Sequence, residues 1–285
     1  MKKWFAAFIL VLVIGILGAC GNSNTNETSE KQEGASDKAA TESKAIQFGA
    51  TAGPYSDMLS KAIIPGLEAK GYTVKVVEFS DYIQPNKALD NGDIQANLFQ
   101  HTIYMENFAK ENNMDLTALI SVPTAPMGIY SNTYKSLDEV KDGATVTIPN
   151  DPTNAARAFN TLQDEGLIKI DENADPLTVS EKDVVENKKN LVFQPIEAGQ
   201  LPRSVESADL AAVPGNFALA ANMDLLSALA LENMLDPYRN IVAVKTENKD
   251  SQLAQDIKAV IESEDFEKVI DTEFKGFGKP EWMKK

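Results

Sequence analysis

Short runs of apolar and β-branched residues recur along the chain from residue 45 onward, and each is bounded by polar or turn-forming residues. Such runs predict strands, here over 45–51, 73–79, 94–100, 144–149, 191–196, 209–215 and 240–246. Between several of them the apolar residues recur at helical spacing, which predicts amphipathic helices over 54–70, 83–91, 102–112, 153–166, 217–222 and 250–262. Strands alternating with helices indicate an α/β fold with mainly parallel sheets.

The patterned part of the chain is long enough for two domains. Two irregular segments, 124–140 and 231–246, interrupt the alternation of strands and helices. They suit a chain that leaves a first α/β domain (45–130 plus 238–285), builds a second (131–237) and returns. A ligand cleft would then lie between the domains, at the carboxyl ends of their strands. A single large sheet is the alternative.

The N-terminal sequence predicts an export signal. Residues 1–19 hold two lysines and then an uninterrupted apolar stretch from Trp4 to Ala19, which is typical of a secretory signal peptide and shorter than the roughly 20 residues of a spanning helix. The ending Leu17-Gly18-Ala19-Cys20 resembles a bacterial lipobox, in which the cysteine is lipidated. A plain secretory signal with an incidental cysteine is the alternative.

Residues 20–44 predict a lipidated cysteine followed by a flexible tether. The stretch 21–44 has three alanines and no other apolar residue, so it cannot bury enough surface to order itself. Without the two lysines of the signal, 25 of the 27 Lys and Arg remain against 42 Asp and Glu, a net charge of −17. This balance argues against nucleic acid or anionic lipid as a partner, so a lipid chain on Cys20 would hold the protein at the membrane.

The sequence contains no recognisable catalytic apparatus. Cys20 is the single cysteine and His101 the single histidine, which excludes an intramolecular disulfide and a histidine-rich metal site. No nucleotide-binding glycine loop, zinc-protease motif or nucleophile elbow is present. We therefore expect no cofactor, no metal and no enzymatic activity, with an enzyme built on carboxylates alone as the alternative.

Arg157 stands where a cation is locally disfavoured. Asp151 and Pro152 predict a helix start at the N-cap and first helical positions, and a helix N-terminus carries partial positive charge. A bound carboxylate would explain the placement, because a guanidinium binds it bidentately beside free backbone N–H groups. The alternative is an exposed arginine paired with Asp151 or Glu165.

Two asparagines and an aromatic group are further binding candidates. Asn154 lies on the same helix face as Arg157 and could bind the carboxylate or cap the helix. Asn216 follows a predicted strand and could enter a cleft or be an ordinary turn residue. The candidates for a side-chain pocket are Tyr82, Phe99, His101 and Tyr104. Ordinary core packing is the alternative for the aromatic residues, and a structural role for the histidine.

From Ala45 to the C-terminus the order of motifs resembles the methionine-binding lipoproteins of bacterial ABC importers. The resemblance rests on "FSDYIQPNKALDNGDIQANLFQHTIYMENF" (79–108), "PMGIYS" (126–131), "GATVTIPNDPTNAARAF" (143–159) and "LAAVPGNFAL" (210–219). It implies a periplasmic-binding-protein fold of type II, with two α/β domains, a hinge and an interdomain cleft. It also implies that Arg157, Asn154 and Asn216 contact the ligand, and that the aromatic group holds a thioether, since sulfur packs well at ring edges.

The implied function is capture of methionine or a related amino acid for a membrane permease and its ATPase. We expect a monomer on the extracytoplasmic face of the cell membrane, at a Gram-positive cell surface. Tyr55, Pro214 and Phe217 depart from the family pattern, and "TAPMG" lacks the acidic residue that the family more often has before the proline. These departures leave open a methionine-containing dipeptide or another small amino acid as ligand, or an adhesin on the same scaffold.

Overall fold

The computed structural model describes residues 44–284, which form one compact unit. The predicted signal peptide (1–19), Cys20 and nearly all of the predicted tether lie outside this range. Lys44, assigned to the tether, is the first residue of strand β1 (Lys44–Thr51). In residues 44–284 no helix has both the length and the apolar character that crossing a bilayer requires.

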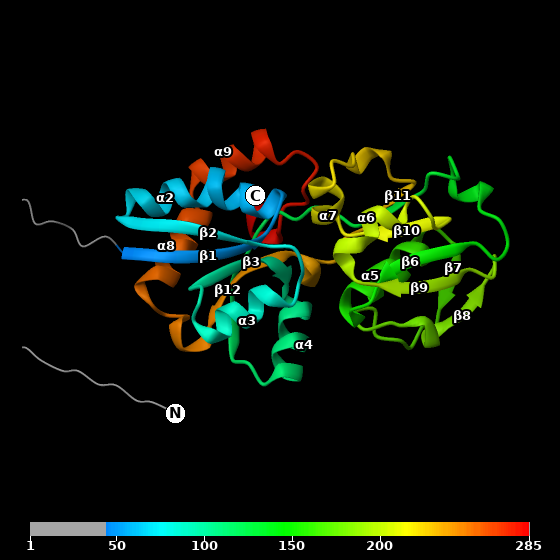
Figure 1. Ribbon diagram of the computed structural model, residues 1–285, viewed down its shortest axis with the longest axis horizontal. Coiled ribbons are helices and arrows are strands. Elements are labelled where there is room, and N and C mark those ends of the chain that lie inside the picture. Colours follow the sequence, from blue (N-terminus) through cyan, green and yellow to red (C-terminus); the bar gives the residue numbers. More distant parts are fainter. Residues whose placement is uncertain (1–43, 285) are drawn as a thin grey trace, which may run out of the picture. The chain divides into compact units, whose positions relative to one another are not determined.

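Both ends of the described chain belong to the lobe of the first sheet (Figure 1). Its strand order is β2 (Tyr72–Phe79), β1, β3 (Ala96–His101), β12 (Asn240–Lys245) and β4 (Leu116–Ser121). β1 runs parallel to β2 and β3, whereas β12 is antiparallel to β3 and β4. The accompanying helices are α1 (Pro54–Met58), α2 (Ile64–Ala69), α3 (Gln84–Asn91), α4 (Thr102–Asn112), α8 (Gln252–Ile261) and α9 (Glu264–Glu273).

The second sheet is built from the middle of the chain. Its order is β11 (Ala230–Leu231), β5 (Gly128–Tyr130), β10 (Leu210–Val213), β6 (Thr145–Pro149) and β9 (Val192–Ile196). β6 is parallel to β9 and β10, and β5 is antiparallel to β10 and β11. The hairpin of β7 (Ile168–Ile170) and β8 (Val184–Asn187) and the helices α5 (Pro152–Asp164), α6 (Leu201–Ser204) and α7 (Gly215–Ala220) complete this part.

All seven predicted strands and all six predicted helical stretches are present, but the prediction of mainly parallel sheets was wrong. The chain passes from β4 to β5 and back from β11 to β12, and these strands join each sheet in the antiparallel sense. The alternative of a single large sheet is also wrong. The domain bounds stay a prediction. β5 pairs in the second sheet, so the first passage between the sheets precedes residue 128 rather than residue 131.

The predicted helix over 54–70 is divided into three segments. α1 is followed by a π-helical turn over Leu59–Ile63, and α2 then begins with Pro65 in its first turn. Proline has no N–H to donate to the preceding turn, and π-turns accommodate such interruptions within helices. The sequence pattern shows the apolar face of this segment but not its change of pitch.

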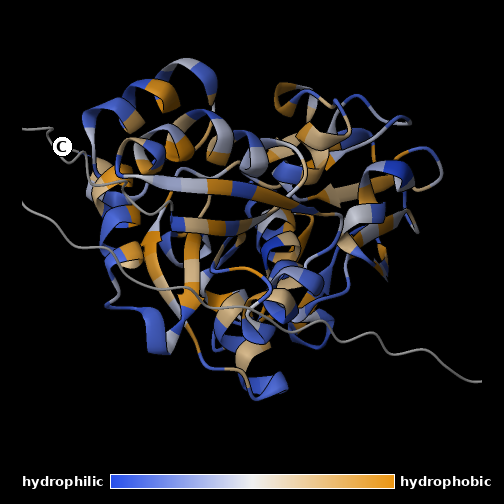
Figure 2. Ribbon diagram, turned by 60° about the vertical axis from the view of Figure 1, so that its left-hand side comes forward, coloured by the Kyte–Doolittle hydropathy of each residue, from blue (hydrophilic) through white to orange (hydrophobic). Residues whose placement is uncertain are grey.

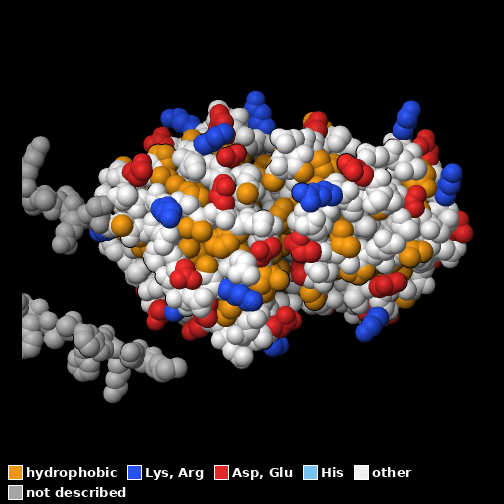
Figure 3. Space-filling view, in the orientation of Figure 1, with side chains coloured by type: hydrophobic (Ala, Val, Ile, Leu, Met, Phe, Trp, Pro, Cys, Tyr) orange, Lys and Arg blue, Asp and Glu red, His pale blue; other side chains and the backbone are white. Residues whose placement is uncertain are grey.

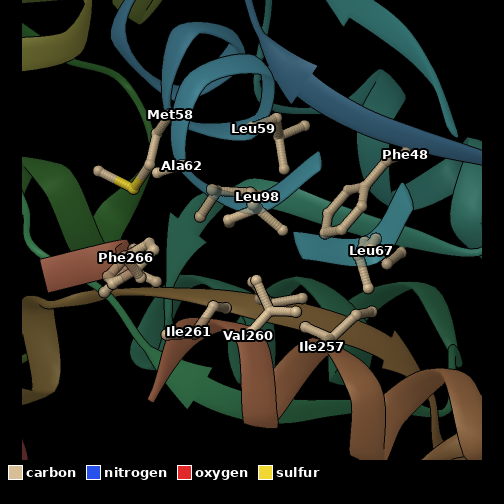
Figure 4. Close-up of a cluster of buried hydrophobic side chains, with 14 of the residues drawn as sticks. Phe48, Met58, Leu59, Ala62, Leu67, Leu98, Ile257, Val260, Ile261 and Phe266 are labelled. Atoms are coloured by element: carbon tan, nitrogen blue, oxygen red, sulfur yellow. The ribbon is translucent and has the colours of Figure 1, made fainter. Parts of the chain in front are cut away.

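Each sheet has its own hydrophobic core. In the first, Phe48 and Leu98 of the sheet lie in one cluster with Leu67, Ile257 and Phe266 of the helices (Figure 4). A second cluster forms around β6, β10 and α5. Full burial of one such side chain contributes roughly 1.5–3 kcal/mol. In Figure 2 some strands are mostly hydrophobic, whereas the helices carry both kinds of residue. On the face drawn in Figure 3, acidic and basic side chains are interspersed.

Candidate functional site

A small buried cavity has walls that come from the first sheet and from helices of both lobes. All seven residues predicted as ligand contacts line it: Tyr82, Phe99, His101, Tyr104, Asn154, Arg157 and Asn216. Six lining residues were not among those predicted contacts: Tyr55, Gln100, Thr124, Ala125, Gly215 and Asn240. The structure therefore brings the candidate residues together, while their contact with a ligand stays a prediction.

Aromatic rings form one wall of the cavity. The ring of Tyr82 lies 5.8 Å from those of Phe99 and Tyr104, centroid to centroid, and the hydroxyl of Tyr104 donates to the carbonyl of Tyr82 at 2.9 Å. The rings belong to a buried hydrophobic cluster, so they do pack in a core, as the alternative interpretation states. Because the same rings also face the cavity, they offer apolar surface and ring edges to a ligand side chain.

His101 is held as a neutral imidazole. It is the N-cap of α4, where its Nδ1 accepts a hydrogen bond from the backbone N–H of Tyr104 at 3.1 Å. The ring proton must therefore reside on Nε2, which lies 3.3 Å from Oδ1 of Asn154 and can donate to it. Burial, and then the positive charge of Arg157, lower the pKa of His101 to about 3.

This pKa makes stability depend on pH in a direction that can be tested. The unfolded chain protonates His101 near pH 6.5 and the folded chain does not, so folding loses stability as pH falls below 6.5. Between pH 7 and pH 5, we expect the free energy of unfolding to fall by about 2 kcal/mol more in the parent than in a His101→Gln variant. Urea unfolding at the two pH values measures this difference.

Asp151 acts in the opposite sense but cancels in that comparison. Burial raises its pKa, with hydrogen bonds from Asn154 and Thr153 partly opposing the rise, so its contribution to folding grows as pH falls. That contribution is present in both proteins. Equal pH dependence of the parent and the variant would contradict a neutral, buried His101.

Arg157 already has a carboxylate partner within the protein. Its Nε and Nη2 donate to Oε1 and Oε2 of Glu232 at 2.8 and 2.6 Å, and both side chains are only 5% exposed. The predicted alternative of an exposed arginine paired with Asp151 or Glu165 is wrong. Burial opposes the charge of Arg157, but the Glu232 carboxylate outweighs this effect and holds the guanidinium pKa above its ordinary value.

The start of α5 agrees with the prediction only in part. Asp151 is the N-cap, Pro152 occupies the first turn, and the Asp151 carboxylate accepts from the backbone N–H of Asn154 at 2.9 Å. This N–H is therefore not free for a ligand. Asn154 does not cap the helix; its Nδ2 donates to Asp151, and its Oδ1 accepts from Nη1 of Arg157 at 2.9 Å. Asn154 thus links Arg157 to Asp151 and, through His101, to the first sheet.

Asn216 offers a hydrogen-bond donor that nothing in the described chain uses. It lies in the first turn of α7 and does not adopt the left-handed conformation, so the alternative of a turn residue is wrong. Its Oδ1 accepts from the hydroxyl of Tyr82 at 2.6 Å, whereas its buried Nδ2 has no partner among residues 44–284. A buried donor left unpaired costs free energy, which a ligand acceptor would recover.

Gly215 permits this close approach of α7 to the cavity. A Cβ at this position would lie 2.3 Å from the carbonyl oxygen of Pro126 and 2.7 Å from the Cβ of Ala125. Any larger residue would therefore push α7 away from the segment that connects the sheets. The position of Asn216 in the cavity depends on this glycine.

Two of the three departures from the family pattern have clear structural roles. Tyr55 lines the cavity and is fully buried, which raises the pKa of its phenol to about 12. The ring of Phe217 packs on that of Tyr82 at 4.8 Å between centroids. Pro214 is the N-cap of α7. The site also lacks a metal-ligand set, since residues 44–284 contain no cluster of histidine and carboxylate side chains suited to an ion.

Two sheets joined by two chain passages, with a buried polar and aromatic cavity between them, define a two-lobed ligand-binding protein. The chain belongs to the NlpA lipoprotein family, whose model matches residues 46–282. This finding and the structural neighbours confirm the predicted family and the predicted periplasmic-binding-protein fold of type II.

Three relatives show how far the similarity extends. The methionine-binding lipoprotein MetQ of Bacillus subtilis is 32% identical over 283 residues, which cover 97% of each chain. The structure of a nutrient-binding protein from Burkholderia cenocepacia bound to methionine has a TM-score of 0.76 and 36% identity, and the match covers 81% of this chain and 97% of that one. A periplasmic substrate-binding protein of an ABC transporter from Coxiella burnetii has a TM-score of 0.74 and 32% identity, covering 79% and 95%.

Proposed function

We propose that this protein is the lipid-anchored, extracytoplasmic substrate-binding protein of an ABC importer, and that it captures methionine or a closely related amino acid. Relatives named for methionine binding and for ABC transport support this function. Its partners would be a membrane permease and its ATPase. Anchoring would occur through Cys20, at a Gram-positive cell surface, with a monomeric body. The protein would carry no enzymatic activity.

The observation that carries the proposal is the pair of hydrogen-bond donors in one buried cavity. Asn216 presents an unpartnered Nδ2, and three hydrogen bonds account for three of the five N–H groups of Arg157. One N–H on each terminal nitrogen of Arg157 therefore remains for a ligand. Donors of this kind suit the α-carboxylate of an amino acid, while the rings of Tyr82, Phe99 and Tyr104 suit its thioether.

Capture would use closure of the two lobes on the ligand. Two hydrogen bonds cross the cavity, from Tyr82 to Asn216 and between His101 and Asn154. In each, the first residue belongs to the lobe of the first sheet and the second to the other lobe. These contacts would form as the cavity closes, so closure would be coupled to the arrangement of the carboxylate donors.

Methionine should raise the thermal stability of the protein, because a ligand that binds only the folded state stabilises it. At a hundredfold excess of methionine over Kd we expect about 2.7 kcal/mol of additional stability. Differential scanning fluorimetry with each amino acid and with methionyl dipeptides measures the shift and ranks the ligands. Alanine serves as the control, since it has the same charged groups and no thioether.

Each competing function has its own signature in that screen. An adhesin on this scaffold would show no shift with any amino acid. A dipeptide binder would respond more strongly to a methionyl dipeptide than to methionine. An enzyme would consume its ligand on prolonged incubation, and chromatography of the mixture would detect the product.

A further inference from the structure

Glu232 has a buried carboxylate that contacts Arg157 of the ligand site but does not itself line the cavity. It follows β11 directly, where its backbone N–H donates to the carbonyl of Met127 at 2.9 Å. Its carboxylate accepts from the backbone N–H of Met127 at 3.0 Å as well as from Arg157. All of these partners belong to the second lobe, so closure or opening of the lobes leaves the arrangement intact.

Glu232 binds Arg157 from outside the cavity, so it does not occupy the position of a ligand. Arg157 lines the cavity and Glu232 does not. Glu232 uses the edge of the guanidinium formed by Nε and Nη2, while one N–H on each terminal nitrogen remains available. The guanidinium can therefore hold Glu232 and a ligand carboxylate at the same time, on different edges.

The charges around the cavity follow from this arrangement. Arg157 is positive, Glu232 cancels that charge at 2.6 Å, and His101 is neutral. Asp151 lies one amide further away, joined to Arg157 through Asn154. Buried charges interact strongly because water does not screen them. The cavity thus has no net positive charge to attract an anion, although it contains an arginine.

We infer that Glu232 sets the charge selectivity of the ligand site, so that a zwitterionic amino acid is accepted and a ligand with a net negative charge is rejected. This inference rests on the proposed capture of an amino acid. It assigns the specificity to a residue 75 positions away from Arg157 in the sequence. Without Glu232, the uncompensated guanidinium would favour anions.

Three methionine derivatives of similar shape and different charge test the inference. They are the 2-hydroxy acid analogue of methionine, with one negative charge, methionine itself, with none, and methionine amide, with one positive charge. Isothermal titration calorimetry gives Kd for each with the parent and with Glu232→Gln. We expect the affinity for the hydroxy acid relative to methionine to rise at least tenfold in the variant, and that for the amide relative to methionine to fall at least tenfold.

Ratios between ligands separate selectivity from damage to the fold, since a general loss of structure changes all three affinities alike. A uniform change across the three ligands would overturn the inference, whether it is a uniform loss from distortion or a uniform gain from removal of a competing carboxylate. Glu186→Gln on the exposed strand β8 is the matched control and should leave every ratio unchanged. If the parent itself does not bind methionine, the proposed function fails instead.

Discussion

Replacement of Arg157 by methionine should lower the free energy of unfolding of the ligand-free protein by about 3–5 kcal/mol. The loss arises because the Glu232 carboxylate remains buried with only the N–H of Met127 as a hydrogen-bond partner in the described chain. A lone buried charge of this kind is far more costly than the pair it came from. Urea unfolding of the ligand-free protein, followed by circular dichroism, measures the change.

A double variant shows whether the unpaired charge is the cause. Arg157→Met combined with Glu232→Gln removes both charges and keeps an amide oxygen to accept from Met127. We expect this protein to regain most of the lost stability. The control is Arg203→Met on α6, an exposed arginine that should change stability by no more than about 0.5 kcal/mol. A double variant no more stable than the single one would show that packing, and not charge, causes the loss.

The elements of the fold that the sequence predicts are those with strong periodicity. β10 is a continuous apolar run whose burial follows from composition, whereas β1, β3 and β6 are largely buried although they mix apolar with polar residues. β4 is only partly buried along its whole length and β11 has two residues, so neither produces a clear pattern. The antiparallel direction of these strands depends on where the chain passes between the sheets, which no local pattern specifies.

The residues of the site likewise divide into those that a local sequence pattern predicts and those that only the tertiary fold brings together. Phe99, His101 and Tyr104 were predicted together because a strand end followed by a helix start places neighbouring side chains together. Glu232 was missed because it lies in an irregular segment and meets Arg157 only through the tertiary fold. The position of Arg157 near a helix N-terminus, where a cation is disfavoured, correctly indicated that an anion pairs with it. One such anion is the Glu232 carboxylate of the protein itself. The two N–H groups of Arg157 that have no hydrogen-bond partner in the described chain remain for a ligand.

Replacement of Asn216 by aspartate should reduce the affinity for methionine by at least about 25-fold. The new side chain keeps an oxygen to accept from Tyr82 but exchanges the unpartnered Nδ2 donor for a second oxygen. That oxygen would repel the ligand carboxylate, and breaking a buried charge-assisted contact costs about 2–5 kcal/mol, where each 1.4 kcal/mol is a factor of ten. Isothermal titration calorimetry with methionine measures the loss.

Two comparisons assign this loss to the carboxylate contact. Methioninol has the same side chain and ammonium but no carboxylate, so its affinity should fall much less than that of methionine in the aspartate variant. Tyr82→Phe removes the hydroxyl that holds Asn216 and keeps the ring, and it should cost no more than about tenfold, as expected for one neutral hydrogen bond. Methionine binding within threefold of the parent, or an equal loss for methioninol, would remove Asn216 from the carboxylate site.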